Sequence, residues 1–92
     1  MQRQIKDFDW DERNTAHIAR NHVDDYEAEF VILFDEPFFR KTRDEKYVAF
    51  GVTQAGRYLF VVFAVKGEGL IRVITSRDMI PRERNDYKRN RR

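Results

Sequence analysis

The chain has 92 residues, which suits one domain, because two hydrophobic cores of normal size need a longer chain. It contains no cysteine, so disulfide bonds and thiolate metal sites are excluded. The first ten residues are polar and charged, which argues against a signal peptide, and no apolar run approaches the length of a membrane span. We therefore expect a single domain over residues 1–92, located in the cytoplasm and without membrane contact.

The net charge of +2 conceals a division along the chain. Residues 1–36 carry four basic and ten acidic side chains, a net of −6, whereas residues 37–92 carry fourteen basic and six acidic side chains, a net of +8. The chain closes with PRERNDYKRNRR, which ends in a basic tail from about residue 88 to residue 92. Such a tail either attracts a polyanion by non-specific electrostatics or is a solvated, frayed terminus that binds nothing.

The N-terminal part predicts a strand and then a helix. The stretch IKDFDW (5–10) alternates in the way that suits a short edge strand with an aromatic face. Asp9 or Asp11 can cap a helix through residues 11–22, because a carboxylate there accepts the unpaired amide hydrogens of the first turn. One sector of this helix is mixed rather than apolar, with Asn14, His17, Ile18 and Asn21.

A second helix is predicted over residues 26–34, with Asp24 and Asp25 as its potential caps. The side chains that share an apolar face of this helix are Tyr26, Phe30, Leu33 and Phe34. Pro37 ends the helix, because the residue before a proline is disfavoured in the helical conformation. A short strand followed by a loop is expected between residues 38 and 45.

Three further strands are predicted over residues 46–53, 56–65 and 70–76, joined by loops of hairpin length and glycine content. Pro81 can start a last helix, where its missing amide hydrogen costs nothing. The pattern predicts an α+β protein with a short N-terminal strand, two helices, a three- to four-stranded antiparallel meander and a C-terminal helix.

Several classes of chemistry are excluded by the motifs. The two histidines, His17 and His22, are five residues apart, about 140° around a helix, so they do not face one ion. The chain lacks a glycine-rich phosphate loop, a nucleophile elbow and a cysteine nucleophile. We therefore expect neither a metal site nor another cofactor.

Arg72 interrupts an apolar strand and has to reach water, a carboxylate or a phosphate. One interpretation is an ion pair with an acid such as Glu68 or Asp44. In the other interpretation Arg72 reaches a phosphate, and the alternation of a strand puts Arg72, Ile74 and Ser76 on one face. A concave basic face beside the last helix would then consist of Arg72, Ser76, Arg77, Lys46 and Arg82. Such a face can bind a phosphodiester and stabilise the added charge of a pentavalent phosphoryl transition state.

Glu45 lies between Asp44 and Lys46 in the basic half of the chain. A carboxylate among cations stays ionised at neutral pH, which suits a hydrogen-bond acceptor or a weak base. The alternative is an exposed loop acid that pairs with its neighbours.

The order of motifs resembles the BrnT family of toxin–antitoxin ribonucleases, small cytoplasmic proteins with a RelE-like fold. The matching segments are FDWD (8–11), N-x-x-H-I-A-R (14–20), His22-Val23, F-D-x-P (34–37), G-R-Y-L-F-V-V-F (56–63), R-V-I-T-S-R-D-M (72–79) and E-R-x-x-Y (83–87). Members of the better-known branch of the family usually have His-Gly where this chain has His22-Val23, and a histidine with Glu-Arg ahead of the first long strand, where this chain has residues 43–46.

The resemblance implies a metal-independent endoribonuclease that inhibits translation and is neutralised by an antitoxin protein. The residues it implies for catalysis are Glu45, Lys46, Arg72, Arg77 and His22. The residues expected to bind RNA are Arg43, Ser76, Arg82 and Lys88. The expected partners are an RNA substrate and a cognate antitoxin, in a homodimer or a toxin–antitoxin hetero-oligomer.

Two other functions stay open from the sequence. The same basic face can hold nucleic acid or an acidic protein without cleaving it, which would make the chain a binding module. Alternatively, the polar side of the sheet is an oligomer interface of a structural or regulatory protein.

Overall fold

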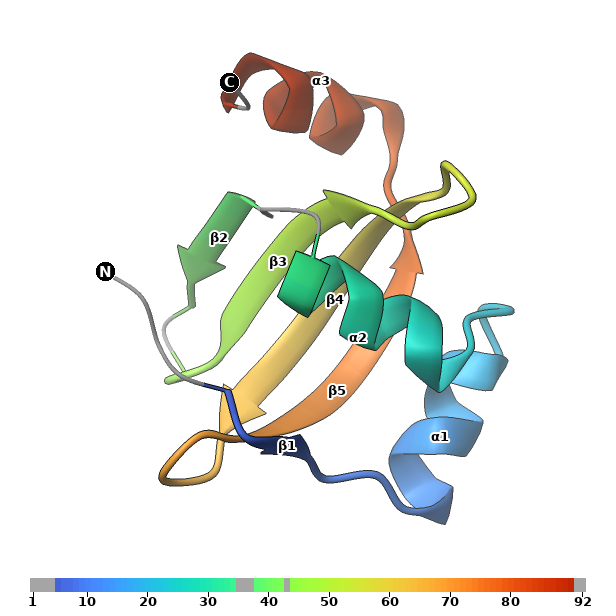
Figure 1. Ribbon diagram of the computed structural model, residues 1–92. Helices are drawn as coiled ribbons and strands as arrows, with labels where there is room; N and C mark the ends of the chain where they lie inside the picture. Colours follow the sequence, from blue (N-terminus) through green and yellow to red (C-terminus); the bar gives the residue numbers. More distant parts are fainter. Residues whose placement is uncertain (1–4, 35–37, 43, 91–92) are drawn as a thin grey trace.

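The computed structural model describes residues 5–34, 38–42 and 44–90. Figure 1 shows the helices and strands, which are β1 (Asp7–Phe8), α1 (Glu12–Ala19), α2 (Asp25–Phe34), β2 (Phe38–Lys41), β3 (Tyr47–Val52), β4 (Tyr58–Val65), β5 (Leu70–Asp78) and α3 (Pro81–Asn90). The predicted α+β class and the predicted order of its elements are confirmed.

The strands form one sheet in the order β1-β5-β4-β3-β2. The four strands from β2 to β5 are an antiparallel meander, and β1 pairs in parallel with the start of β5. Gly56 has a φ of 92° in the β3–β4 turn, and Gly67 has a φ of 127° in the β4–β5 turn. These backbone conformations favour glycine, so the two hairpin loops follow from the sequence.

Helix α1 covers the part of the β5 edge that β1 leaves unpaired. β1 pairs only with Leu70 and Ile71. Beyond them, the side-chain amide of Asn14 donates to the Val73 carbonyl at 3.1 Å, and that of Asn21 donates to the Ser76 carbonyl at 2.9 Å. α1 ends at Ala19, earlier than predicted, and the mixed sector is polar because Asn14 on the helix and Asn21 in the turn after it bind the sheet edge.

The two faces of the sheet carry separate hydrophobic clusters. On one face α1 and α2 pack against the strands, in a cluster that includes Ile18, Val31, Leu59, Val61 and Val73. On the other face α3 packs through Tyr87 against Val48, Phe50 and Met79. Figure 1 shows α2 crossing the sheet and α3 at the far end of its strands. The face beside α3 is only partly covered by this one helix.

The apolar face predicted for α2 is not the buried one. Its buried residues are Ala28, Val31 and Ile32, whereas Tyr26, Leu33 and Phe34 are exposed. Apolar residues occupy both sides of this helix, so periodicity alone did not identify the inner side. The aliphatic side is the one that packs on the sheet, and the aromatic side faces outward.

A β-bulge in β5 changes which residues share a face. Val62 pairs with Thr75, whereas the next residue of β4, Phe63, pairs with Val73, so Ile74 is an extra residue. After the bulge Ser76 points to the same side as Val73 and is fully buried. The prediction that Ser76 shares a face with Arg72 is therefore wrong, because one inserted residue reverses the alternation.

Candidate nucleic-acid interface

The bulge brings Arg77 to the same sheet face as Arg72. Arg72 is opposite Ala64 and Arg77 is opposite Phe60, and these two partners are four residues apart on β4. Directly opposed residues of antiparallel strands point to the same side. The open face beside α3 therefore has an arginine near each end of β5.

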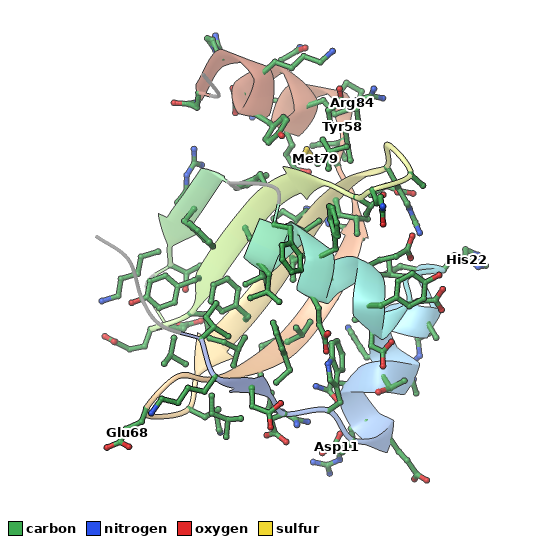
Figure 2. The ribbon with its side chains drawn as sticks, viewed as in Figure 1. Asp11, His22, Tyr58, Glu68, Met79 and Arg84 are labelled. Atoms are coloured by element: carbon green, nitrogen blue, oxygen red, sulfur yellow. The ribbon has the colours of Figure 1, made fainter. Side chains whose placement is uncertain are left out.

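Arginines on this face stack on aromatic rings of β4. The guanidinium carbon of Arg77 lies 3.8 Å from the ring centroid of Phe60, and that of Arg84 lies 4.2 Å from the ring centroid of Tyr58. The Lys88 ammonium is 5.7 Å from the same Tyr58 ring. Figure 2 shows Tyr58 and Arg84 close together at the start of α3. The rings attract these cations and hold two guanidinium planes at the surface.

Glu83 fixes the orientation of Arg77. Its two carboxylate oxygens accept hydrogen bonds from Arg77 Nη1 and Nη2 at 2.8 and 3.0 Å, and one oxygen also accepts from the Ile80 amide at 3.0 Å. The hydrogen bonds from Arg77 are the main cause of the lowered pKa of Glu83. Arg77 stays 38% exposed, so its guanidinium is both anchored and accessible.

Loss of the Glu83 charge is expected to weaken the fold at low pH. Because the folded-state pKa of Glu83 lies below its usual value, the ion pair stabilises the protein above about pH 4.3 and is lost as the pH falls further. Glu83→Gln should lower the free energy of unfolding at pH 7 by about 1 kcal/mol. Urea denaturation between pH 3 and pH 7 measures the free energy of unfolding of both proteins and its dependence on pH. If the free energy of unfolding falls as steeply with pH in the variant as in wild type, the acid destabilisation comes from other carboxylates.

Arg72 pairs with two acids that precede α1. Its Nη1 lies 3.3 Å from a carboxylate oxygen of Asp9, and its Nη2 lies 3.2 Å from Asp11. Asp11 is also the N-cap of α1, where it accepts from the amides of Arg13 and Asn14. Arg72 is the main cause of the lowered pKa of Asp11. An ion pair was thus predicted, but Glu68 and Asp44 were the wrong partners, because β1 brings Asp9 and Asp11 beside β5.

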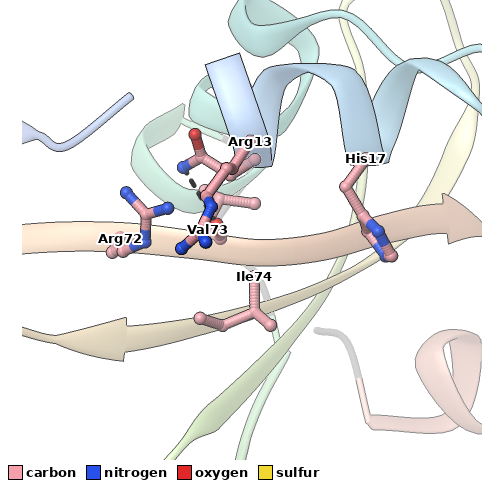
Figure 3. A pocket seen from close by; sticks show the side chains of 6 residues that line it. Arg13, His17, Arg72, Val73 and Ile74 are labelled. Carbon is pink, nitrogen blue, oxygen red and sulfur yellow. Dashed lines mark hydrogen bonds between the residues drawn. The ribbon is translucent and has the colours of Figure 1, made fainter. Parts of the chain in front are cut away.

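A pocket of about 250 Å³ opens between α1 and β5 (Figure 3). The side chains that line it are Arg13, Asn14, His17, Arg72, Val73 and Ile74. Within the described chain, the guanidinium of Arg13 and the imidazole of His17 form no hydrogen bond. Figure 3 shows His17 reaching from α1 across the strand. The pocket thus combines an imidazole with two guanidinium groups.

From the sequence, His17 was considered only as a potential metal ligand, and Arg13 was missed. The signal was the four-residue spacing of Arg13 and His17 in RNTAH, which places both on one side of a helix. The spacing does not reveal that β5 faces these two side chains.

The structure does not bring the predicted proton acceptors to the arginines. Glu45 lies in the β2–β3 turn with a φ of 64°, and its 85% exposed side chain pairs with Lys41 at 3.7 Å. His22 lies in the α1–α2 turn with a φ of 61°, and its carbonyl accepts from Arg57 at 2.6 Å. Neither side chain hydrogen-bonds with Arg72 or Arg77 among the described residues. β4 separates β3 from β5, which explains why Glu45 is remote.

The other predicted residues are dispersed. Arg82 and Lys88 are exposed on α3, and Lys46 is half-buried just before β3. Arg43 lies outside the described residues. Of the predicted basic face, the structure places Arg72 and Arg77 on the side of the sheet that α3 covers in part and Arg82 on α3, whereas Ser76 is buried on the opposite side and Lys46 lies beyond β4 from Arg72.

The buried hydroxyl of Ser76 forms no hydrogen bond with any described residue. Ser76→Ala removes this unsatisfied group, so the free energy of unfolding should stay the same or rise by up to about 1 kcal/mol. RNA binding should not change, because the side chain is not exposed. Thermal denaturation and an RNA titration measure the two effects. Loss of RNA binding with unchanged stability would restore Ser76 as an RNA contact.

Metal ligands and membrane spans were also searched for in the described segments. Nowhere in them do three or more histidine, aspartate or glutamate side chains gather as potential metal ligands. None of their helices is long and apolar enough to cross a membrane.

The chain is thus a small α+β protein whose open sheet face carries stacked arginines beside a basic helix. The family model described as the ribonuclease toxin BrnT of type II toxin–antitoxin systems matches residues 10–83. The match spans most of the sequence, so the chain belongs to the BrnT family. Family membership implies a cognate antitoxin and an RNA target.

A solved structure supports the assignment at the level of the fold. The crystal structure of the Brucella abortus ribonuclease toxin BrnT is similar to this chain, with a TM-score of 0.66 and 22% sequence identity. The similarity covers 80% of this chain and 96% of the Brucella chain. A comparison with curated protein sequences finds no match.

Proposed function

We propose that this chain is an endoribonuclease toxin that cleaves cytoplasmic RNA without a metal ion and thereby inhibits translation. The observation that carries the proposal is the stack of Arg77 on Phe60, held in place by Glu83 at the open sheet face. Family membership supplies the class of substrate.

The face suits single-stranded RNA rather than a duplex. An unpaired base can stack on an arginine plane, and Arg77 and Arg84 offer two such planes. Arg82 and Lys88 on α3 are exposed cations for the backbone phosphates. Because every base can stack, we expect the face to select RNA with unpaired bases and to have little preference for their sequence.

In this proposal cleavage takes place at the pocket between α1 and β5. His17 accepts the proton of a ribose 2′-hydroxyl, and the 2′-oxygen forms a bond to the adjacent phosphorus. The phosphorus–5′-oxygen bond breaks, the leaving oxygen takes a proton from water, and the products are a 2′,3′-cyclic phosphate and a 5′-hydroxyl end. Arg13, whose guanidinium has no ion pair within the described chain, neutralises charge that develops on the phosphorane, whereas the charge of Arg72 is already balanced by Asp9 and Asp11.

The two parts of the site are connected by β5. Because of the bulge, Arg72 and Arg77 are opposite residues that are four apart on β4, about 13 Å along a strand. One RNA strand that follows β5 therefore contacts the stacked arginines with its bases and presents a phosphate at the pocket.

Purified protein should cleave a single-stranded RNA oligonucleotide in the presence of EDTA and leave 2′,3′-cyclic phosphate ends, detected by mass spectrometry. DNA of the same sequence is the matched control, since it lacks the attacking hydroxyl and should stay intact. Intact RNA, together with normal growth on expression in cells, would contradict the proposal.

The alternative is a binding module that uses the same face without cleavage. The positions of Glu45 and His22, both away from the arginines, favour it. In that case Arg72→Ala weakens salt-dependent RNA binding, while wild type and variant both leave the RNA intact.

A further inference from the structure

The outer side of α2 carries a cluster of large apolar side chains, here called the α2 patch, formed by Tyr26, Phe30, Leu33 and Phe34. Tyr26, Leu33 and Phe34 are 66%, 42% and 68% exposed. The rings of Phe30 and Phe34 lie 5.5 Å apart. In the described chain the other exposed large apolar side chains lie away from α2: Phe39 is on β2, and Ile80 is between β5 and α3. A contiguous exposed cluster of this kind is typical of a protein-binding surface.

An acidic rim borders the patch at the N-terminal end of α2, where one of the carboxylates, Glu27, is paired with Arg57 at 3.3 Å. Residues 24–34 contain four carboxylates, Asp24, Asp25, Glu27 and Glu29, and no lysine or arginine. Asp24 lies close enough to raise the pKa of the Tyr26 phenol through a side-chain hydrogen bond. Such a rim repels RNA, and it opposes symmetric pairing of two copies, because like charges would meet. It attracts a partner that combines apolar side chains with lysine or arginine.

The patch and the RNA face are on opposite sides of the sheet. Val31 and Ile32 of α2 pack in the cluster that contains Val61, whereas Tyr87 of α3 packs in the cluster bordered by Phe60. Val61 and Phe60 are adjacent on β4 and point to opposite faces. A protein seated on the α2 patch therefore leaves the stacked arginines uncovered.

We infer that the α2 patch is the anchoring surface for the cognate antitoxin, which binds it through an amphipathic segment with apolar side chains along one face and basic side chains beside them. An amphipathic helix that packs its apolar face against α2 is the recognition mode that this combination of apolar cluster and acidic rim fits. The inference rests on membership of a toxin–antitoxin family, and it holds whether or not the chain cleaves RNA.

The test is isothermal titration of the purified cognate antitoxin, the product of the reading frame beside the toxin gene, into toxin variants. Leu33→Ser combined with Phe34→Ser should weaken binding about tenfold or more, because apolar anchors dominate such interfaces. Ile80→Ser is the matched control, an apolar residue of similar exposure at the start of α3, and should change the affinity less than about twofold. Asp24→Lys combined with Asp25→Lys should weaken binding and reduce its dependence on salt.

Circular dichroism confirms that each variant is folded, and the RNA cleavage assay separates this inference from the proposed function. Wild-type affinity of the Leu33/Phe34 double variant would overturn the inference, as would equal losses in that variant and in Ile80→Ser. Failure of the antitoxin to bind the wild-type protein would also overturn it. A wild-type dimer that the double variant converts to a monomer would assign the patch to a second copy of the chain instead.

Discussion

Replacing His17 with alanine is expected to slow RNA cleavage by a factor of about 10²–10⁴, the usual contribution of a positioned general base. His17 lines the pocket between α1 and β5 together with Arg13 and Arg72. It is exposed, so its loss should not unfold the protein. Single-turnover kinetics with a fluorescent RNA gives the rate, and fluorescence anisotropy should show an RNA affinity within about threefold of wild type.

Two further measurements distinguish proton transfer from a structural role of His17. Added imidazole should partly restore the rate of His17→Ala, because the small molecule can occupy the vacated position in an open pocket. His22→Asn is the comparison, since asparagine tolerates the positive φ of that turn. If His22→Asn abolishes cleavage while His17→Ala does not, the role implied by the family resemblance is correct and the pocket is not the catalytic site.

Replacing Arg77 with lysine is expected to weaken RNA binding about tenfold while the salt dependence of binding stays the same. Lysine keeps the charge but loses both the planar surface over Phe60 and the two-point contact with Glu83. The loss therefore reports stacking, which contributes about 1–3 kcal/mol per base. Anisotropy titrations at several salt concentrations give both the affinity and its salt slope.

Arg82→Lys is the matched control for Arg77→Lys, because Arg82 is an exposed arginine on α3, beside the same sheet face, and its guanidinium contacts no aromatic ring of a described residue. Its affinity should stay within about twofold of wild type. The melting temperature of Arg77→Lys shows whether the variant is also less stable, and therefore whether weaker RNA binding results from partial unfolding. Equal affinity of Arg77→Lys and wild type would mean that the arginine supplies charge alone.

The local signals in the sequence were sufficient for the elements and their order. Asp11 caps α1 as expected, with its carboxylate accepting from two amides of the first turn. Pro81 begins α3, and Gly56 and Gly67 lie in the hairpin turns. These features depend on a few neighbouring residues, so they can be recognised without knowledge of the rest of the fold.

The candidate site was only partly predictable. Arg72 and Arg77 were both identified, and the basic helix that follows them was recognised by its charge. Ser76 was assigned to the wrong face, because a single extra residue at Ile74 arises from pairing with β4 and leaves no mark in strand periodicity. The inner side of α2 was not identified either, since both sides of that helix are apolar.

Composition and local pattern were enough to establish an α+β chain with an acidic first part and a basic second part, because charge, periodicity and capping are properties of adjacent residues. Folding determined which residues meet across long separations: Arg72 with Asp9 and Asp11, His17 with the β5 edge, and Arg77 with Phe60. These contacts depend on strand order, on register and on one bulge, and each of those is set by packing between segments remote in the chain.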